Sequence, residues 1–241
     1  MTHPFPKMIK LTCLAIALAG TSLAQAADPV TDAMQAANGP YRMALYKTNG
    51  TSQAEAQQAL TQAQQAWEKL NAQVGGKPSA PYDRDAAFGK SVSAVSQVYA
   101  KAMTEIAAND LKGAHNTLED AREIMADMRQ RNNVVVFSDH MNAYHAVMEH
   151  IIVDGNNTLA QPKGMLLLTG QAGALSYLAK RLTTQAPASH SQNPEFTSLV
   201  DAVNKSVAAL DAALLNQDLA AVKDAVSKLK GPYSKLFAKF G

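Results

Sequence analysis

One short segment near the middle of the chain concentrates side chains that could bind a metal ion or transfer a proton. It runs from residue 138 to residue 154 and contains His140, Met141, His145, Met148, Glu149 and His150. Imidazole, thioether and carboxylate groups are donors that transition metals accept in proteins. No other part of the sequence gathers such groups, so we expect any chemical function here.

A helical wheel separates these groups by face, with about 100° per residue. His145 and Glu149, four residues apart, are neighbours on one face, and Met148 lies near His145. His140 lies on the other shoulder of the apolar face, whereas His150 lies almost opposite that face. A complete metal site therefore needs further ligands from a facing helix. The candidates on the preceding helix are His115, Asp120, Glu123, Met125 and Met128.

The donor types narrow the choice of metal. Imidazole with thioether and no thiolate suits copper, whereas imidazole with carboxylate suits zinc, nickel or iron. Imidazole must be neutral to bind a metal, so affinity is expected to fall as the pH drops through the usual histidine range, near about 6.5. The sequence thus predicts a protein that binds or delivers a transition metal ion, with copper first among the candidates.

Two other interpretations stay open. The histidines and methionines could be ordinary core residues, in a non-catalytic scaffold or accessory protein of an envelope complex that exposes an apolar groove. Haem is a third option: b-type bundle cytochromes, which this chain resembles only in general composition, use a Met on the first helix and a His on the last. Met34 fits the first role, but the last helix has no histidine, so His115 or His140 would have to serve. His190, in a loop rich in Pro and Ser, is expected to be solvated.

An unrecognised enzyme shares the third place with haem: Glu149 and His150 could act as acid and base, but nothing in the sequence positions a substrate, so no enzyme is expected. The sequence has no Gly-x-Ser-x-Gly, no His-Glu-x-x-His and no phosphate-binding glycine loop. A single cysteine, Cys13, lies in the expected signal peptide, so the mature chain would lack disulfides, thiolate zinc sites and covalently attached haem.

The first 26 residues have the pattern of a cleaved signal peptide. Lys7 and Lys10 precede an apolar run from Leu11 to Leu23, and Ala24-Gln25-Ala26 offers the small residues of a cleavage site. The run is shorter than the roughly 20 apolar residues that span a bilayer. We therefore expect a soluble periplasmic protein that begins at Ala27 and has no transmembrane anchor.

Charge argues against a polyanionic partner. Cleavage would remove two lysines and no acid, which leaves 20 basic against 20 acidic residues. No cluster of Lys and Arg with interleaved aromatic residues is present, so nucleic acid is not expected as a partner. An envelope or periplasmic protein partner is compatible with this balance.

Apolar residues recur at spacings of three and four through nearly the whole mature chain. The stripe from Ala56 to Val74, which includes Trp67, is typical. This periodicity predicts an all-α protein, an antiparallel bundle of about eight helices joined as hairpins. Trp67 should be buried.

Helix boundaries follow from capping residues and breaks. Caps are expected at Ser52, at Asp110, at Ser138 and in the turn of Asn216, Gln217 and Asp218. Longer breaks are expected at residues 75–81, 154–157 and 185–194. They suggest an N-terminal bundle half of residues 27–154 and C-terminal hairpins of residues 155–241, packed as one domain.

Overall fold

The computed structural model describes residues 28–74 and 76–241, and within them all regular structure is helical. The expected signal peptide lies outside the described residues. The helices are α1 (Pro29–Thr48), α2 (Gln53–Val74), the 3₁₀ helix η1 (Tyr82–Arg84), α3 (Phe88–Ala107), α4 (Leu111–Arg131), α5 (Phe137–Leu159), α6 (Gly164–Thr184), α7 (Ala188–Ser191), α8 (Pro194–Leu215), α9 (Leu219–Ser227) and α10 (Lys230–Phe240). The prediction of an all-α bundle is confirmed. None of the described helices is long and apolar enough to cross a membrane.

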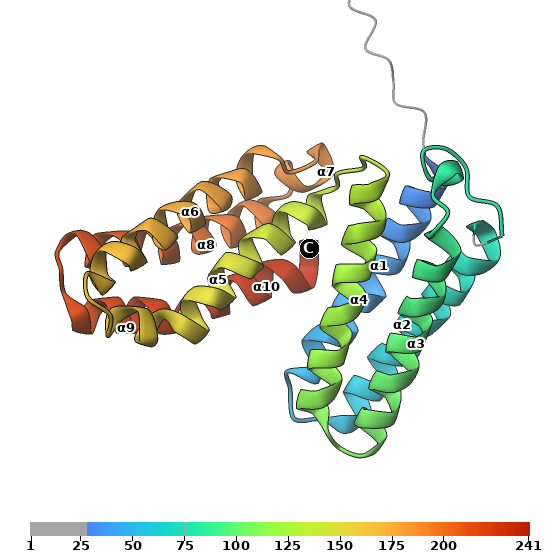
Figure 1. The fold of residues 1–241 in the computed structure, drawn as a ribbon, viewed down its shortest axis with the longest axis horizontal. Coiled ribbons are helices and arrows are strands. Elements are labelled where there is room, and N and C mark those ends of the chain that lie inside the picture. Colours follow the sequence, from blue (N-terminus) through green and yellow to red (C-terminus); the bar gives the residue numbers. More distant parts are fainter. Residues whose placement is uncertain (1–27, 75) are drawn as a thin grey trace, which may run out of the picture.

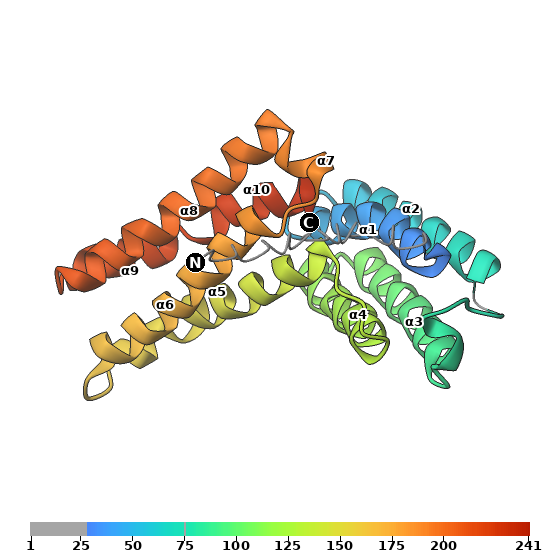
Figure 2. The same ribbon diagram turned by 90° about the horizontal axis from the view of Figure 1, so that it is seen from above.

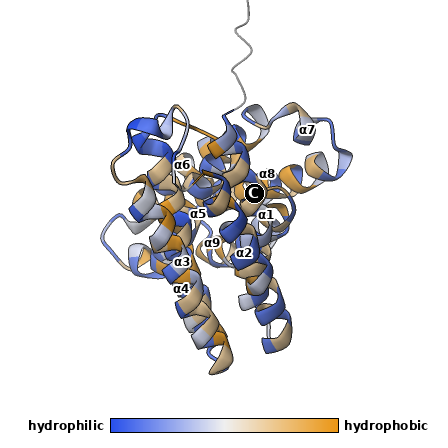
Figure 3. Ribbon diagram, turned by 90° about the vertical axis from the view of Figure 1, so that its right-hand side faces the viewer, coloured by the Kyte–Doolittle hydropathy of each residue, from blue (hydrophilic) through white to orange (hydrophobic). Residues whose placement is uncertain are grey.

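Helices α1 to α4 form a four-helix bundle, the first half of the molecule (Figure 1). Hydrophobic and hydrophilic residues alternate along each helix, as expected when one face is buried (Figure 3). The rings of Tyr41, Trp67 and Tyr99 meet in its core. Trp67 is 1% exposed, and its indole N–H donates to the carbonyl of Val92 over 3.0 Å. The expected burial of Trp67 is confirmed.

Helices α5 to α10 form the second half. Helices α5 and α6 make a hairpin, α8 packs against α6, and α9 and α10 continue the chain back toward α1. The ring of Tyr233 on α10 stacks on Tyr144 of α5, with centroids 5.2 Å apart. Its hydroxyl donates to the carbonyl of Met141 over 3.2 Å. These contacts fasten α10 to α5.

The two halves meet where α10 packs against α1, and they diverge from that junction (Figure 2). The chain passes from the first half to the second through residues 132–136, which connect α4 with α5. Arg129 of α4 holds the carboxylate of Asp139 of α5, with 3.0 Å from Nε to Oδ1. Asn38 of α1 donates to the carbonyl of Gly241 over 2.9 Å. Side chains of α1, α4, α5 and α10 therefore face one another at the junction.

Several expected caps are present and one is wrong. The carboxylates of Asp110 and Asp218 accept hydrogen bonds from the first turns of α4 and α9, and Ser52 accepts one from the first turn of α2. Helix α5, however, begins at Phe137 and not after Ser138. Asp139 accepts from the backbone N–H of Val136 over 3.0 Å, so the carboxylate three residues on stabilises this helix start.

The break expected at residues 154–157 is also wrong. Helix α5 continues through them to Leu159, and the turn falls at residues 160–163, where Lys163 has a φ of 62°. A glycine inside a helix costs roughly 1 kcal/mol relative to alanine. Gly155 is nevertheless buried together with Ile151 and Thr158 on the packed face of α5, and this tertiary packing offsets the cost. The boundary expected between residues 154 and 155 thus falls inside a helix.

Candidate metal centre at the junction of the two halves

A small cavity lies where α1, α4, α5 and α10 meet. It has a volume of about 30 Å³, somewhat more than the roughly 10–15 Å³ that a cavity needs to hold one water molecule. Its walls include His115 of α4, His145 and Met148 of α5, and Tyr233 of α10. The cavity is therefore suited in size to a single ion or water molecule.

His115 reaches the cavity with a defined pattern of hydrogen bonds. Its Nδ1 lies 3.1 Å from the carbonyl of Leu45 on α1, a group that can only accept. Nδ1 therefore carries the ring hydrogen, and Nε2 keeps its lone pair, which the side-chain amide of Asn49 approaches to 3.4 Å. Burial lowers the pKa of His115. A histidine whose second nitrogen donates to a backbone carbonyl is oriented as metal-binding histidines commonly are.

His145 approaches from the second half. Its ring stacks on Tyr233, with centroids 5.4 Å apart, and its side chain is 17% exposed. Burial lowers the pKa of His145 to about 3, and Arg122, Lys230 and His115 act in the same direction. The imidazole is consequently neutral at physiological pH.

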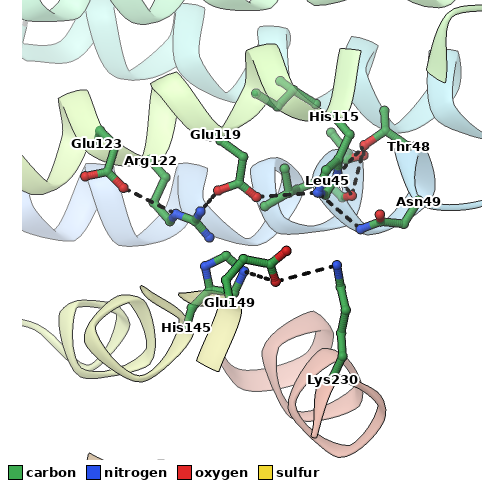
Figure 4. A network of polar contacts seen from close by, with 12 residues as sticks. Leu45, Thr48, Asn49, His115, Glu119, Arg122, Glu123, His145, Glu149 and Lys230 are labelled. Atoms are coloured by element: carbon green, nitrogen blue, oxygen red, sulfur yellow. Dashed lines mark hydrogen bonds and ion pairs between the residues drawn. The ribbon is translucent and has the colours of Figure 1, made fainter. Parts of the chain in front are cut away.

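Two ion pairs flank the imidazoles (Figure 4). Glu119 of α4 pairs with Arg122, whose side chain is 9% exposed. Across the junction, Oε2 of Glu149 lies 3.7 Å from Nζ of Lys230 and accepts no hydrogen bond. Each carboxylate thus has a cation as its nearest partner.

The same carboxylates also lie near the two histidines. Nε2 of His115 is 3.5 Å from Oε1 of Glu119, and Nε2 of His145 is 4.0 Å from Oε2 of Glu149. With the Nε2 of His115 unprotonated, both members of its pair are acceptors, and a cation placed between them would be stabilised.

Helices α4 and α5 carry the same spacing of these residues. His115 and Glu119 form a His-x-x-x-Glu segment, and His145 and Glu149 form a second one thirty residues later. Only the second segment was predicted as part of a site. Glu119, Arg122 and Lys230 were not predicted from the sequence, although the repeated spacing is a signal that could have indicated Glu119.

The remaining histidines lie elsewhere. His150 is 53% exposed on its side chain, and its ring contacts Asp154 at 3.0 Å and Gln171 at 3.1 Å. His140 does not line the cavity, and burial lowers its pKa, with Arg181 adding to the effect. Of the six expected ligands, His115, His145 and Met148 line the cavity, Glu149 adjoins it, and His140 and His150 do not reach it.

The expectation that His190 is solvated is met only in part, because its side chain is intermediate in exposure. Its ring packs edge-on against Phe137 and Phe240, with centroids 5.4 and 5.3 Å away, and close to Phe196. Aromatic residues distant in the sequence converge there, which the composition of the surrounding loop does not indicate.

The side chains available at the cavity limit how a metal ion could be bound. In the part of the chain that the structure describes, no three side chains of His, Cys, Asp or Glu lie close enough together to hold a metal ion. Methionine is not among these four residue types, and the thioether of Met148 lines the same cavity as the two imidazoles. A metal ion would therefore bind to two imidazoles and a thioether, or would have to draw the carboxylates away from Arg122 and Lys230.

Comparison of the chain with known protein families, with curated proteins and with solved structures gave no significant match. Function therefore has to be inferred from the cavity itself.

Proposed function

We propose that the protein binds a single copper ion, in the cuprous state, through His115, His145 and Met148. The observation that carries this proposal is that two neutral, mostly buried imidazoles from different helices and one thioether share a cavity of about 30 Å³. Soft thioether ligands select cuprous copper, and imidazole suits copper as well. No thiolate is needed for this donor set.

Charge favours a monovalent ion. The two cations beside the cavity, Arg122 and Lys230, are paired with Glu119 and Glu149, and Glu123, 3.8 Å from Arg122, has a side chain that is 76% exposed. The three proposed ligands are neutral. A bound cation therefore keeps its own charge in a partly buried site, and a single charge costs less to bury than a double one.

A divalent ion would use the site differently. Zinc, nickel or iron would favour the carboxylates of Glu119 and Glu149 over the thioether. Those carboxylates would first have to leave Arg122 and Lys230, and Arg122 would then be a buried cation without its main partner. Such a loss typically costs about 3–5 kcal/mol. This cost places copper ahead of the divalent metals.

The cavity size favours an ion over haem. A haem would need the two halves to separate, since roughly 300 Å³ or more is typical of pockets for organic ligands. The proposed compartment is the periplasm, on the strength of the signal-peptide pattern in residues 1–26. We accordingly propose a periplasmic copper-binding or copper-delivery protein.

The test is a titration of the purified mature protein with cuprous copper, in competition with a chromogenic chelator under reducing conditions. One equivalent should bind. Met148→Leu conserves side-chain volume, so it should cost less than about 1.5 kcal/mol in stability while weakening copper binding at least about tenfold. His145→Gln should weaken binding further.

The matched control is His150→Gln, a change on the same helix outside the cavity, which should leave affinity unchanged. Circular dichroism would show that each variant is folded. Failure of the unmutated protein to bind any of copper, zinc or nickel more tightly than about 10 μM, roughly 7 kcal/mol, would end the metal proposal.

A second candidate function, an accessory or scaffold role, has one specific observation in its favour. A groove between the C-terminal part of α5 and α9 is lined by Ile152, Leu159, Leu219 and Val226. Leu215, just before it, is 78% exposed. Photocrosslinking in cells from position 219 should give a discrete product if this face contacts a partner, whereas the exposed position of Lys69 in the first half should give none.

A further inference from the structure

A second and larger cavity lies at the other end of the contact between α1 and α10. It has a volume of about 530 Å³, within the range of roughly 300–1,000 Å³ that is usual for small-molecule sites. Its walls come from both halves of the molecule. They include Asn38 and Arg42 of α1, Phe137 of α5, Gln185, His190 of α7, and Phe240 of α10.

Arg42 is the charged side chain of this cavity. Among the described residues no Asp or Glu side chain lines it, and the backbone of Gly241, whose carbonyl accepts a hydrogen bond from Asn38, forms part of the wall. The Nε of Arg42 is buried and has no hydrogen-bond partner among the described residues, and its Nη2 makes a long contact of 3.5 Å with the carbonyl of Lys239. Burial lowers the pKa of this guanidinium. By contrast, the buried Arg122 and Arg129 each pair with a carboxylate.

A guanidinium that is partly buried, with a buried N–H left without an acceptor, is unfavourable, so its retention calls for a partner. Carboxylates match its planar fork of donors with two parallel hydrogen bonds. The first requirement for a ligand is thus a carboxylate at Arg42.

The opposite wall is aromatic. The ring of His190 packs against Phe137 and against Phe240, with centroids 5.4 and 5.3 Å apart. Burial lowers the pKa of His190, with Arg42 adding to the effect, so its ring is neutral, and it hydrogen-bonds the backbone of Phe240. The amides of Gln185 and Asn38 are further polar groups at the rim. A flat apolar body would pack against the phenylalanine rings while its acid group reaches Arg42.

We infer that this cavity binds a small organic carboxylate with an aromatic or similarly flat apolar body, with Arg42 holding the carboxylate and Phe137 and Phe240 contacting the body. An inorganic anion would bind to Arg42 alone and would make no contact with the aromatic wall. Cations and neutral ligands would leave Arg42 unpaired. The site shares no ligand residue with the proposed copper centre and does not depend on it.

The experiment is a calorimetric titration of the mature protein with 3-phenylpropionate, alongside its neutral amide and acetate. We expect saturable binding of the acid, binding of the amide at least about tenfold weaker, and no measurable binding of acetate, because tenfold corresponds to about 1.4 kcal/mol. Arg42→Gln should weaken the binding of 3-phenylpropionate at least tenfold. Phe240→Leu should also weaken the binding of this acid, because the contact with the phenylalanine ring is lost.

Arg84→Gln, a change at an exposed arginine outside the cavity, is the matched control and should bind normally. Arg42→Gln should melt at the same or a higher temperature, since it removes an unpaired charge. Equal affinities for acid and amide on the unmutated protein, unchanged affinity in Arg42→Gln, or no saturation by about 5 mM acid would each overturn the inference.

Discussion

Replacing His145 with Gln should make the protein less sensitive to acid. The pKa of His145 is about 3 in the folded protein, against about 6.5 in an unfolded chain. Above pH 6.5 the ring is neutral in both states and contributes no pH dependence. Below pH 6.5 the unfolded chain takes up a proton that the folded protein does not, so stability falls by about 1.4 kcal/mol per pH unit until the pH reaches the folded pKa near 3.

The size of the effect follows from this window. At pH 4.5, two units below the unfolded pKa, the loss from this one residue is about 3 kcal/mol. Urea unfolding at pH 7.0 and pH 4.5, followed by circular dichroism, measures it. The free energy of unfolding of the unmutated protein should fall by about 2–3 kcal/mol more than that of His145→Gln over this interval. The other titrating groups are the same in the two proteins, so their contribution cancels when the pH-dependent losses of stability are subtracted.

The same reasoning changes the expected pH dependence of copper binding. The sequence suggested that affinity would fall near pH 6.5, but burial keeps His145 neutral well below that value. Affinity should therefore persist to lower pH than an exposed pair of histidines would allow. If both proteins lose equal stability between pH 7.0 and 4.5, or if an imidazole signal assigned to His145 titrates near 6.5, the account of this cavity is wrong.

Three further outcomes are expected. Arg129→Met should lower the free energy of unfolding by about 2–4 kcal/mol, because it leaves Asp139 without its partner at the start of α5; Asp139→Asn should cost at least as much, since it leaves the more deeply buried Arg129 unpaired, and no loss in either variant in the same urea series would contradict the pairing. Trp67, 1% exposed, should emit at wavelengths typical of buried indole, and a spectrum like that of indole in water would contradict the fold of the first half. Mass spectrometry of protein secreted to the periplasm should find Ala27 at the N-terminus, whereas an intact leader or lipid on Cys13 would refute the signal-peptide prediction.

Much of the fold could be predicted because it depends on local properties of the chain. Apolar residues at spacings of three and four lie on one face of a helix whatever the neighbours are, so the stripe that contains Trp67 indicated both the helix and its buried side. Asp110 and Asp218 cap helices through side chains only three residues from the groups they bind. Local signals fail where packing outweighs them, as at Gly155, which is buried inside α5.

The candidate site was likewise predictable only where its residues are close in the sequence. Spacing alone placed His145, Met148 and Glu149 near one another, because residues three and four apart on a helix are neighbours. That His115 faces them was one of five possibilities on the preceding helix, and only the junction of the two halves selected it.

The sequence by itself determined the helical class, most helix boundaries and the clustering of donors on α5, since each follows from interactions within a few residues. The tertiary structure alone decided the pairing of Glu149 with Lys230, the burial that lowers the pKa of His145, the aromatic setting of His190 and the lack of a carboxylate partner for Arg42 among the described residues. These properties arise between segments that are up to two hundred residues apart, such as α1 and α10, and depend on which surfaces exclude water together. Desolvation and charge pairing act through space, and a linear pattern does not carry them.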